Sequence, residues 1–149
     1  MTTITGAPTN PGRLRMSPGE LLAYRQRKDD ERGLKRFTAL IYLYDSHGTG
    51  FEAPLQLCQR YALKFGWAVS GVITDSGEDS PPDSRAGLRQ ALEIIQSGGA
   101  EALLIPWRSA ISPISGEFDD VAEQLEKAGG FLQIVAGVLA VPADYEGQQ

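Results

Sequence analysis

Strand-like apolar runs and amphipathic helical runs alternate along most of this chain, and this alternation constrains the fold more than any other feature. Four short apolar runs are expected as strands: Thr38–Leu43, Ala68–Thr74, Ala102–Ile105 and Phe131–Val135. Between them, apolar residues recur at helical spacing in Pro54–Phe65, in Arg85–Gln96 and in a helix that Ser115 is expected to cap. Strands joined by helical crossovers run parallel. The sequence therefore predicts an α/β fold with a mainly parallel sheet of about four strands flanked by helices.

The segment before the first strand has a different composition and pattern. Residues 1–16 are rich in Thr, Pro and Gly and are expected to be disordered. Ser17-Pro-Gly-Glu20 has the pattern of a capping box and predicts a helix that runs from about Leu21 to Arg32. We expect residues 1–36 to form a basic N-terminal extension with a short helix, residues 37–141 to form the folded domain, and residues 142–149 to form a polar tail.

Charge is divided unevenly between these parts. Residues 1–37 hold eight Lys/Arg against four Asp/Glu, a net charge of +4, whereas the remainder holds six basic and fifteen acidic residues, a net charge of −9. Proteins bind nucleic acid largely by neutralising phosphates. The acidic body argues against strong DNA binding, so DNA is expected to be a weak partner at most.

Composition excludes several classes of protein. No apolar run approaches the roughly 20 residues that a membrane span requires, and the N-terminus lacks an apolar signal core, so we expect a cytoplasmic protein without membrane contact. The single cysteine, Cys58, excludes an internal disulfide, and the single histidine, His47, excludes a multi-histidine metal site. We expect neither a metal nor a cofactor.

Ser46 is the first candidate for chemistry because it follows the first predicted strand. Parallel α/β sheets bind ligands outside the carboxyl ends of their strands. A serine hydroxyl is a weak nucleophile unless a base or a positive charge assists it. Asp45, Ser46 and His47 are consecutive, whereas catalytic triads assemble across a fold. The alternative interpretation is that Ser46 simply forms a turn after the strand.

The glycines after Ser46 offer a different ligand. Gly48 and Gly50 would allow backbone amides to surround a phosphate, but Gly-Thr-Gly matches neither a Walker loop nor a dinucleotide fingerprint, and no lysine follows. A small-anion or nucleotide pocket is therefore an alternative hypothesis for this loop.

Two arginines lie where they can reach the same edge of the sheet. Arg85, at the start of the second predicted core helix, is a candidate contact for a phosphate. Arg108 follows the third strand and is a weaker candidate, since its neighbours Trp107 and Ser109 suit either a site or a surface stacking contact.

The span Ala39–Val135 resembles the catalytic domain of resolvase/invertase serine recombinases, which implies a resolvase-like, three-layer α/β fold. In that family the first strand runs into Tyr-x-Arg-Val-Ser-Thr, whose serine attacks DNA phosphate, and this chain has Tyr42-Leu43-Tyr44-Asp45-Ser46-His47. Further similarities follow in order: Gln59-Arg-Tyr-Ala62, Gly66-Trp67, Ser84-Arg-Ala-Gly-Leu88, Gly98-Gly99 and Gly130-Phe-Leu-Gln-Ile-Val135. The resemblance implies that Ser46 is the nucleophile and that Arg85 contacts phosphate.

The differences from the family fall on its active site. Tyr44 replaces the arginine two residues before the nucleophile. The family's Leu-Asp-Arg-Leu-x-Arg signature after the third strand is absent, and its aspartate and two arginines align with Ser109, Ala110 and Pro113. Phosphodiester cleavage needs positive donors on the non-bridging oxygens, and each oriented donor that is lost costs on the order of a hundredfold in rate.

The preferred interpretation is a degenerate resolvase-like domain that does not cleave DNA strands and serves as an interaction or regulatory module, as a homodimer or with a protein partner. One alternative is an active serine recombinase in which Ser46 attacks DNA with the help of Arg85 and Arg108. The other is the anion or nucleotide pocket at Gly48 and Gly50. The Leu21–Tyr24 and Val138–Val141 segments are candidate apolar contact surfaces.

Overall fold

The computed structural model describes residues 15–78 and 80–138. Its elements, in chain order, are α3 (Pro18–Arg32), β1 (Thr38–Asp45), α4 (Glu52–Phe65), β2 (Ala68–Ser76), the 3-10 turn η1 (Pro82–Ser84), α5 (Ala86–Gln96), β3 (Ala102–Ile105), the 3-10 turn η2 (Arg108–Ala110), α6 (Ser115–Lys127) and β4 (Phe131–Ile134). The strands and the three core helices fall where the apolar patterns place them, which confirms the predicted α/β class.

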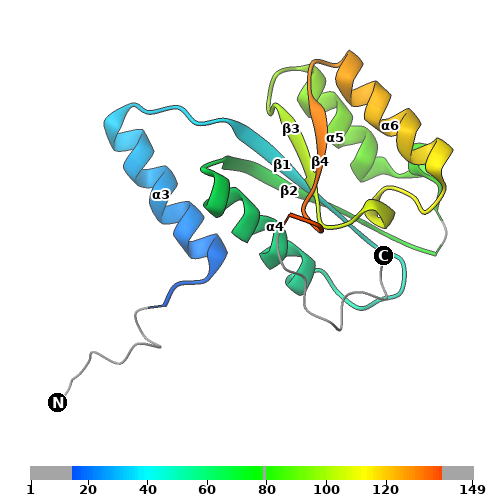
Figure 1. The fold of residues 1–149 in the computed structure, drawn as a ribbon, viewed down its shortest axis with the longest axis horizontal. Helices are drawn as coiled ribbons and strands as arrows, with labels where there is room; N and C mark the ends of the chain where they lie inside the picture. Colours follow the sequence, from blue (N-terminus) through cyan, green and yellow to red (C-terminus); the bar gives the residue numbers. More distant parts are fainter. Residues whose placement is uncertain (1–14, 79, 139–149) are drawn as a thin grey trace.

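The four strands form one sheet in the order β2-β1-β3-β4, and every neighbouring pair is parallel. Helices α5 and α6 lie together on one face of this sheet, while α4 covers the other face and α3 packs outside α4 (Figure 1). The crossovers from strand to strand therefore build a three-layer arrangement with the carboxyl ends of β1 and β3 at one common edge.

The core lies where the two helical layers meet the sheet. Every residue of β3 is buried, and the central part of β1 is equally inaccessible. The apolar faces of the helices close the core, and their buried members are Leu57, Cys58, Tyr61, Ala62, Leu88, Ala91, Ile95, Phe118, Val121 and Leu125. Burial raises the pKa of the Cys58 thiol, so this cysteine is a core residue.

Helix α3 confirms the predicted capping box. The Ser17 hydroxyl accepts from the backbone N–H of Glu20, and the Glu20 carboxylate accepts from the backbone N–H of Ser17. The helix buries only one residue, Asp29, which pairs with Arg36. Its contacts with the rest of the domain include Leu22, which is partly buried against the core, and Arg25, whose guanidinium donates to the carbonyl of Trp67.

Three details of the sequence prediction are wrong. The apolar pattern of Pro54–Phe65 predicts that Phe65 lies on the buried face of its helix, but Phe65, the last residue of α4, is 45% exposed. Ser115 does not cap α6: Ile114 occupies the cap position and makes no side-chain hydrogen bond. The second strand extends past its predicted end at Thr74 and includes Asp75, because β2 continues to pair with Tyr44 and Asp45 of β1.

Some predictions concern residues that the structure does not describe. These are positions 1–14 of the expected disordered segment, the domain boundary at residue 141, the tail 142–149 and most of the Val138–Val141 surface. Within the described residues, Leu21 and Tyr24 are exposed on α3. No helix in this part of the chain is both long and apolar enough to cross a membrane.

Candidate functional site

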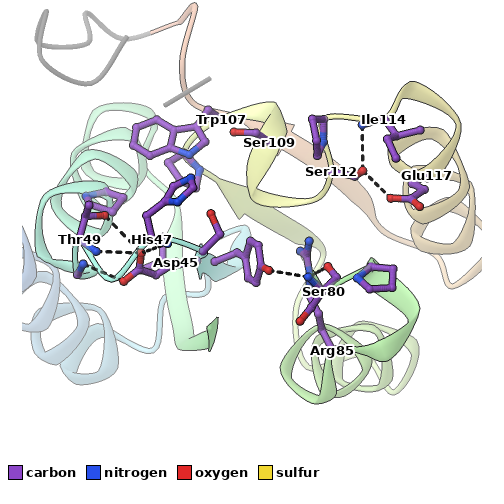
Figure 2. A pocket seen from close by; sticks show the side chains of 18 residues that line it. Asp45, His47, Thr49, Ser80, Arg85, Trp107, Ser109, Ser112, Ile114 and Glu117 are labelled. Atoms are coloured by element: carbon purple, nitrogen blue, oxygen red, sulfur yellow. Dashed lines mark hydrogen bonds between the residues drawn. The ribbon is translucent and has the colours of Figure 1, made fainter. Parts of the chain in front are cut away.

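A cavity of about 570 Å³ lies at the carboxyl ends of β1 and β3. Ser46 and Arg85 both line it, so the fold brings together these two residues that the sequence selected from different segments. Figure 2 shows the loop of Asp45, His47 and Thr49 on one side and the segment of Ser112 and Glu117 on the other. This is the edge at which parallel α/β sheets bind their ligands.

The loop after β1 folds around the carboxylate of Asp45. One carboxylate oxygen accepts from the backbone N–H groups of His47, at 3.2 Å, and Thr49, at 3.1 Å. The other oxygen accepts from the backbone N–H of Gly50 at 2.9 Å. Burial favours the neutral form of Asp45, but these N–H donors outweigh burial and lower the pKa of the carboxyl group. The amides that the sequence suggested for a phosphate therefore bind the chain's own carboxylate.

In this loop, Asp45 does not make the contact between a carboxylate and an imidazole that a catalytic triad needs. The bond between Asp45 and His47 goes to the backbone N–H of His47, not to its imidazole. Gly48 and Gly50 have φ angles of 74° and 94°, a left-handed conformation that glycine adopts without strain. These two glycines let the loop turn back so that its amides face Asp45.

Arg85 lines the cavity and is buried, with a residue exposure of only 5%. Its Nε donates to the carbonyl of Ser80 at 3.0 Å, and its Nη1 donates to the carbonyl of Ala110 at 2.8 Å. The guanidinium carbon lies 3.6 Å from the centroid of the Tyr44 ring. Arg85 therefore ties three segments together, and two of its donor nitrogens already hold backbone acceptors.

Tyr44 is in turn held over Arg85 by the loop that follows β2. Its hydroxyl donates to the carbonyl of Gly77 and accepts from the backbone N–H of Ser80 at 3.1 Å. The same loop thus binds both the ring that covers the guanidinium and the guanidinium itself. The sequence resemblance places Tyr44 where the family has an arginine, but no local pattern signals this stacking, because Tyr44 and Arg85 are distant in the chain.

Asp75 fixes the start of α5, the helix that begins directly after Arg85. Its carboxylate accepts from the backbone N–H groups of Gly87 and Leu88, both at 2.9 Å, and from the hydroxyl of Tyr42 at 2.7 Å. Burial, and then the hydrogen bond to Asp75, raises the pKa of the Tyr42 hydroxyl. Asp75 therefore caps α5 and joins it to the central strand β1.

Arg108, the weaker candidate, lies away from the cavity. Its side chain is exposed, and its guanidinium carbon lies 4.1 Å from the centroid of the Phe118 ring. It is not among the residues that line the cavity. The sequence allowed Arg108 either a contact in the site or a stacking contact on the surface, and the structure contains the stacking contact.

The turn after β3 completes the cavity wall. Ser109, Ser112 and Pro113 line the cavity. The Ser112 hydroxyl donates to the Glu117 carboxylate at 2.7 Å and accepts from the backbone N–H of Ile114 at 3.0 Å. Ser112 therefore organises the start of α6, the task that the sequence assigned to Ser115.

No family model matches the sequence, and no curated protein sequence matches it. Solved structures do match. The C-terminal catalytic domain of ISC1926 TnpA, an IS607-like serine recombinase, superposes with a TM-score of 0.59 and 20% identity over 66% of this chain and 70% of that domain. The N-terminal catalytic domain of TP901-1 integrase gives a TM-score of 0.60 and 18% identity over 66% of this chain and 76% of that one. The chain has the fold of serine recombinase catalytic domains.

A third structure supports the same assignment. A resolvase family site-specific recombinase from Streptococcus pneumoniae superposes with a TM-score of 0.57 and 18% identity over 67% of this chain and 72% of that one. The serine recombinase fold that the sequence motifs implied is thus confirmed. At these identities the similarity concerns the fold, and the chemistry depends on the residues of this chain.

Within this recombinase fold, the cavity carries few groups that attract an anion. Arg85 is the single Lys or Arg among the described lining residues, whereas Asp45 and Glu117 contribute two carboxylates. The described residues also contain no group of three His, Cys, Asp or Glu side chains that could hold a metal ion.

Proposed function

We propose that this domain keeps the serine recombinase fold but does not cleave DNA strands, and that it acts as an interaction or regulatory module. The observation that carries the proposal is the state of Arg85. This arginine is the one phosphate-binding residue that the family resemblance retains, and it is buried under the Tyr44 ring with its Nε and Nη1 bound to carbonyls. A guanidinium held in this way stabilises the protein.

The chemistry of phosphodiester cleavage supports the proposal. The attack of a serine places negative charge on the phosphate oxygens, and donors aimed at those oxygens supply most of the catalysis. Here the backbone amides near Ser46 bind Asp45. A phosphate beside Ser46 would also approach the Asp45 carboxylate, which repels it.

The residues after β3 do not replace the missing donors. The resemblance aligns Ser109, Ala110 and Pro113 with the family's aspartate and two arginines, and none of the three carries a charge. Arg108 lies nearby in sequence but stacks on Phe118 outside the cavity. With several donors lost, each worth on the order of a hundredfold, strand cleavage is expected to fall below detection.

Covalent trapping tests the proposal. The purified protein and its Ser46→Ala variant are incubated with supercoiled plasmid, denatured, and assayed for DNA-linked protein and for nicked or linear plasmid. We expect neither product from either protein. A covalent adduct that forms with the natural protein and disappears with Ser46→Ala would establish an active recombinase and overturn the proposal.

A further inference from the structure

Two cavities adjoin at the start of α6. The first is the cavity of about 570 Å³ at the carboxyl ends of β1 and β3, and the second, of about 480 Å³, lies between α5 and α6. Pro81 and Glu117 line both cavities, which therefore form one cleft from the strand ends into the groove between the helices. An elongated cleft of this kind suits an extended peptide better than a compact ligand.

Carboxylates outnumber the available cations along this cleft. Asp83, Glu117 and Asp120 line its second half, and within the described residues none of them forms a salt bridge. Arg89 is the one exposed cation among the described lining residues, because Arg85 is buried and donates to two carbonyls. The cleft therefore attracts a positively charged ligand and repels a polyanion such as nucleic acid.

The rim of the cleft is apolar beside these carboxylates. Ile114 is 58% exposed, the highest value among the exposed large apolar side chains of the described residues, and it lines the cavity three residues before Glu117. Figure 2 shows both side chains on the same side of the cavity. Pro81 and Pro113 are also exposed in its lining. A ligand that matches this rim combines an apolar group with positive charge, which excludes an inorganic cation.

The spacing of two carboxylates describes how the positive charges of the ligand are arranged. Glu117 and Asp120 are three residues apart on α6, so their Cβ atoms are about 5–6 Å apart. In an extended peptide, residues i and i+2 point to the same side and lie about 7 Å apart. Two basic residues separated by one residue therefore match these two carboxylates, and an apolar neighbour can reach Ile114.

The chain's own described basic segment does not fill this cleft. Helix α3 packs outside α4, on the opposite face of the sheet from α5 and α6 (Figure 1). In a second copy, this helix presents the exposed acids Glu20 and Glu31 beside its cations, so it complements the acidic cleft poorly. The charge of the cleft therefore favours a segment of a different protein.

We propose that this cleft binds an extended basic segment of a partner protein, with an apolar residue against Ile114 and two basic residues against Glu117 and Asp120. The inference rests on the proposed function, because it names the class of partner that the interaction module binds. Each basic side chain forms a charge-assisted hydrogen bond with a carboxylate that has no salt-bridge partner in the described chain.

Selection from random peptides tests the proposal without a choice of sequence in advance. Phage-displayed random dodecapeptides are selected on the immobilised full chain, and the Kd of each enriched peptide is measured by fluorescence anisotropy. We expect peptides with an apolar residue near two basic residues that are separated by one residue, and a Kd that rises with salt. A library that yields no binder, or enriched peptides that are neutral or acidic, would overturn the proposal.

Three variants locate the peptide in the cleft. Glu117→Gln removes a charge but keeps an oxygen that can accept from Ser112, and it should raise the Kd about tenfold. Asp120→Asn should have a similar effect. Ile114→Ala should raise the Kd about fivefold and leave α6 intact, because this side chain makes no capping hydrogen bond. Asp119→Asn is the matched control: it removes the same charge from the same helix outside both cavities, and should change the Kd less than about twofold.

Other occupants of the cleft are measured in parallel. Labelled single-stranded DNA of about 20 nucleotides should not bind, and light scattering should show no dimer that depends on Glu117. DNA binding that Ile114→Ala weakens, or a dimer that Glu117→Gln abolishes, would place another molecule in the cleft and overturn the proposal. Peptides that bind the natural protein and every variant equally would also overturn it.

Two controls separate this result from other effects. Urea unfolding should give similar midpoints for all four variants, so that a weaker Kd reports a lost contact and not a misfolded protein. Covalent trapping on plasmid measures strand cleavage separately. A serine-dependent adduct would overturn the proposed loss of cleavage, whereas only the peptide measurements overturn the partner assigned to the cleft.

Discussion

The guanidinium carbon of Arg85 lies 3.6 Å from the centroid of the Tyr44 ring, and the loop of Gly77 and Ser80 holds both side chains in place. The Tyr44 ring thus covers the buried guanidinium of Arg85. This contact forms a structural junction between β1, the loop after β2 and the start of α5.

The junction predicts that Arg85 contributes to stability far more than Arg108 does. Arg85→Ala removes the donors from two carbonyls, those of Ser80 and Ala110, and should lower the free energy of unfolding by about 2–4 kcal/mol. Arg108→Ala breaks one exposed cation–π contact and should cost less than about 1 kcal/mol. Urea denaturation of the two variants measures the difference. Equal and small losses would contradict a structural role for Arg85.

Tyr44 should contribute through its ring and its hydroxyl separately. Tyr44→Phe keeps the ring over Arg85 but loses the bonds to Gly77 and Ser80, and we expect a loss of about 1 kcal/mol. Tyr44→Ala also loses the stacking and the packing of the ring, and we expect about 2–3 kcal/mol. Thermal or urea unfolding of both variants gives the order. If Tyr44→Phe were as unstable as Tyr44→Ala, the contact between the ring and Arg85 would contribute nothing.

The lowered pKa of Asp45 predicts that the folded protein loses stability in acid. Its pKa is lowered in the folded protein because backbone N–H groups bind the carboxylate, whereas an unfolded aspartate titrates at about 3.9. A group with a depressed folded pKa stabilises the protein above its unfolded pKa, and this contribution is lost as the pH falls through the folded pKa. Stability measured from about pH 5 downward should therefore fall more steeply in the natural protein than in Asp45→Asn.

The titration of Asp45 can also be followed directly. Carbon-detected NMR of the side-chain carboxyl group should give an apparent pKa below about 3.9. The amides of Thr49 and Gly50 should shift in the same transition, because they donate to this carboxylate. A value at or above that of a free aspartate would mean that the loop does not close around Asp45.

The sequence predicted the sheet well because its strands are defined by burial. The run Ala102–Ile105 has no polar residue, and a strand that is buried on both faces must read this way. The helix start at Ser17 was equally readable, since a capping box is a local pattern. Such features depend on neighbours in the chain.

The site was less predictable because its contacts join distant segments. Ser46 and Arg85 were placed at the correct edge, since strand order fixes where strand ends meet. The stacking of Tyr44 on Arg85 depends on the path of the loop after β2, which no local pattern specifies. The role of Asp45 did have a signal: an aspartate before a Gly-Thr-Gly turn commonly accepts from the amides that follow it.

A pair of glycines at equivalent helix positions gives a final prediction. Gly87 and Gly116 are the second residues of α5 and α6. A methyl group on Gly87 would lie 2.7 Å from both carboxylate oxygens of Asp75, which cap α5 and bind Tyr42, whereas nothing lies within 4 Å of a methyl group on Gly116. Gly87→Ala should therefore displace Asp75 and cost about 1–3 kcal/mol. Gly116→Ala should be neutral or stabilise the protein by up to about 1 kcal/mol, because alanine reduces the freedom of the unfolded chain. Urea denaturation compares the two variants, and a Gly87→Ala protein as stable as Gly116→Ala would show that Asp75 does not hold the start of α5.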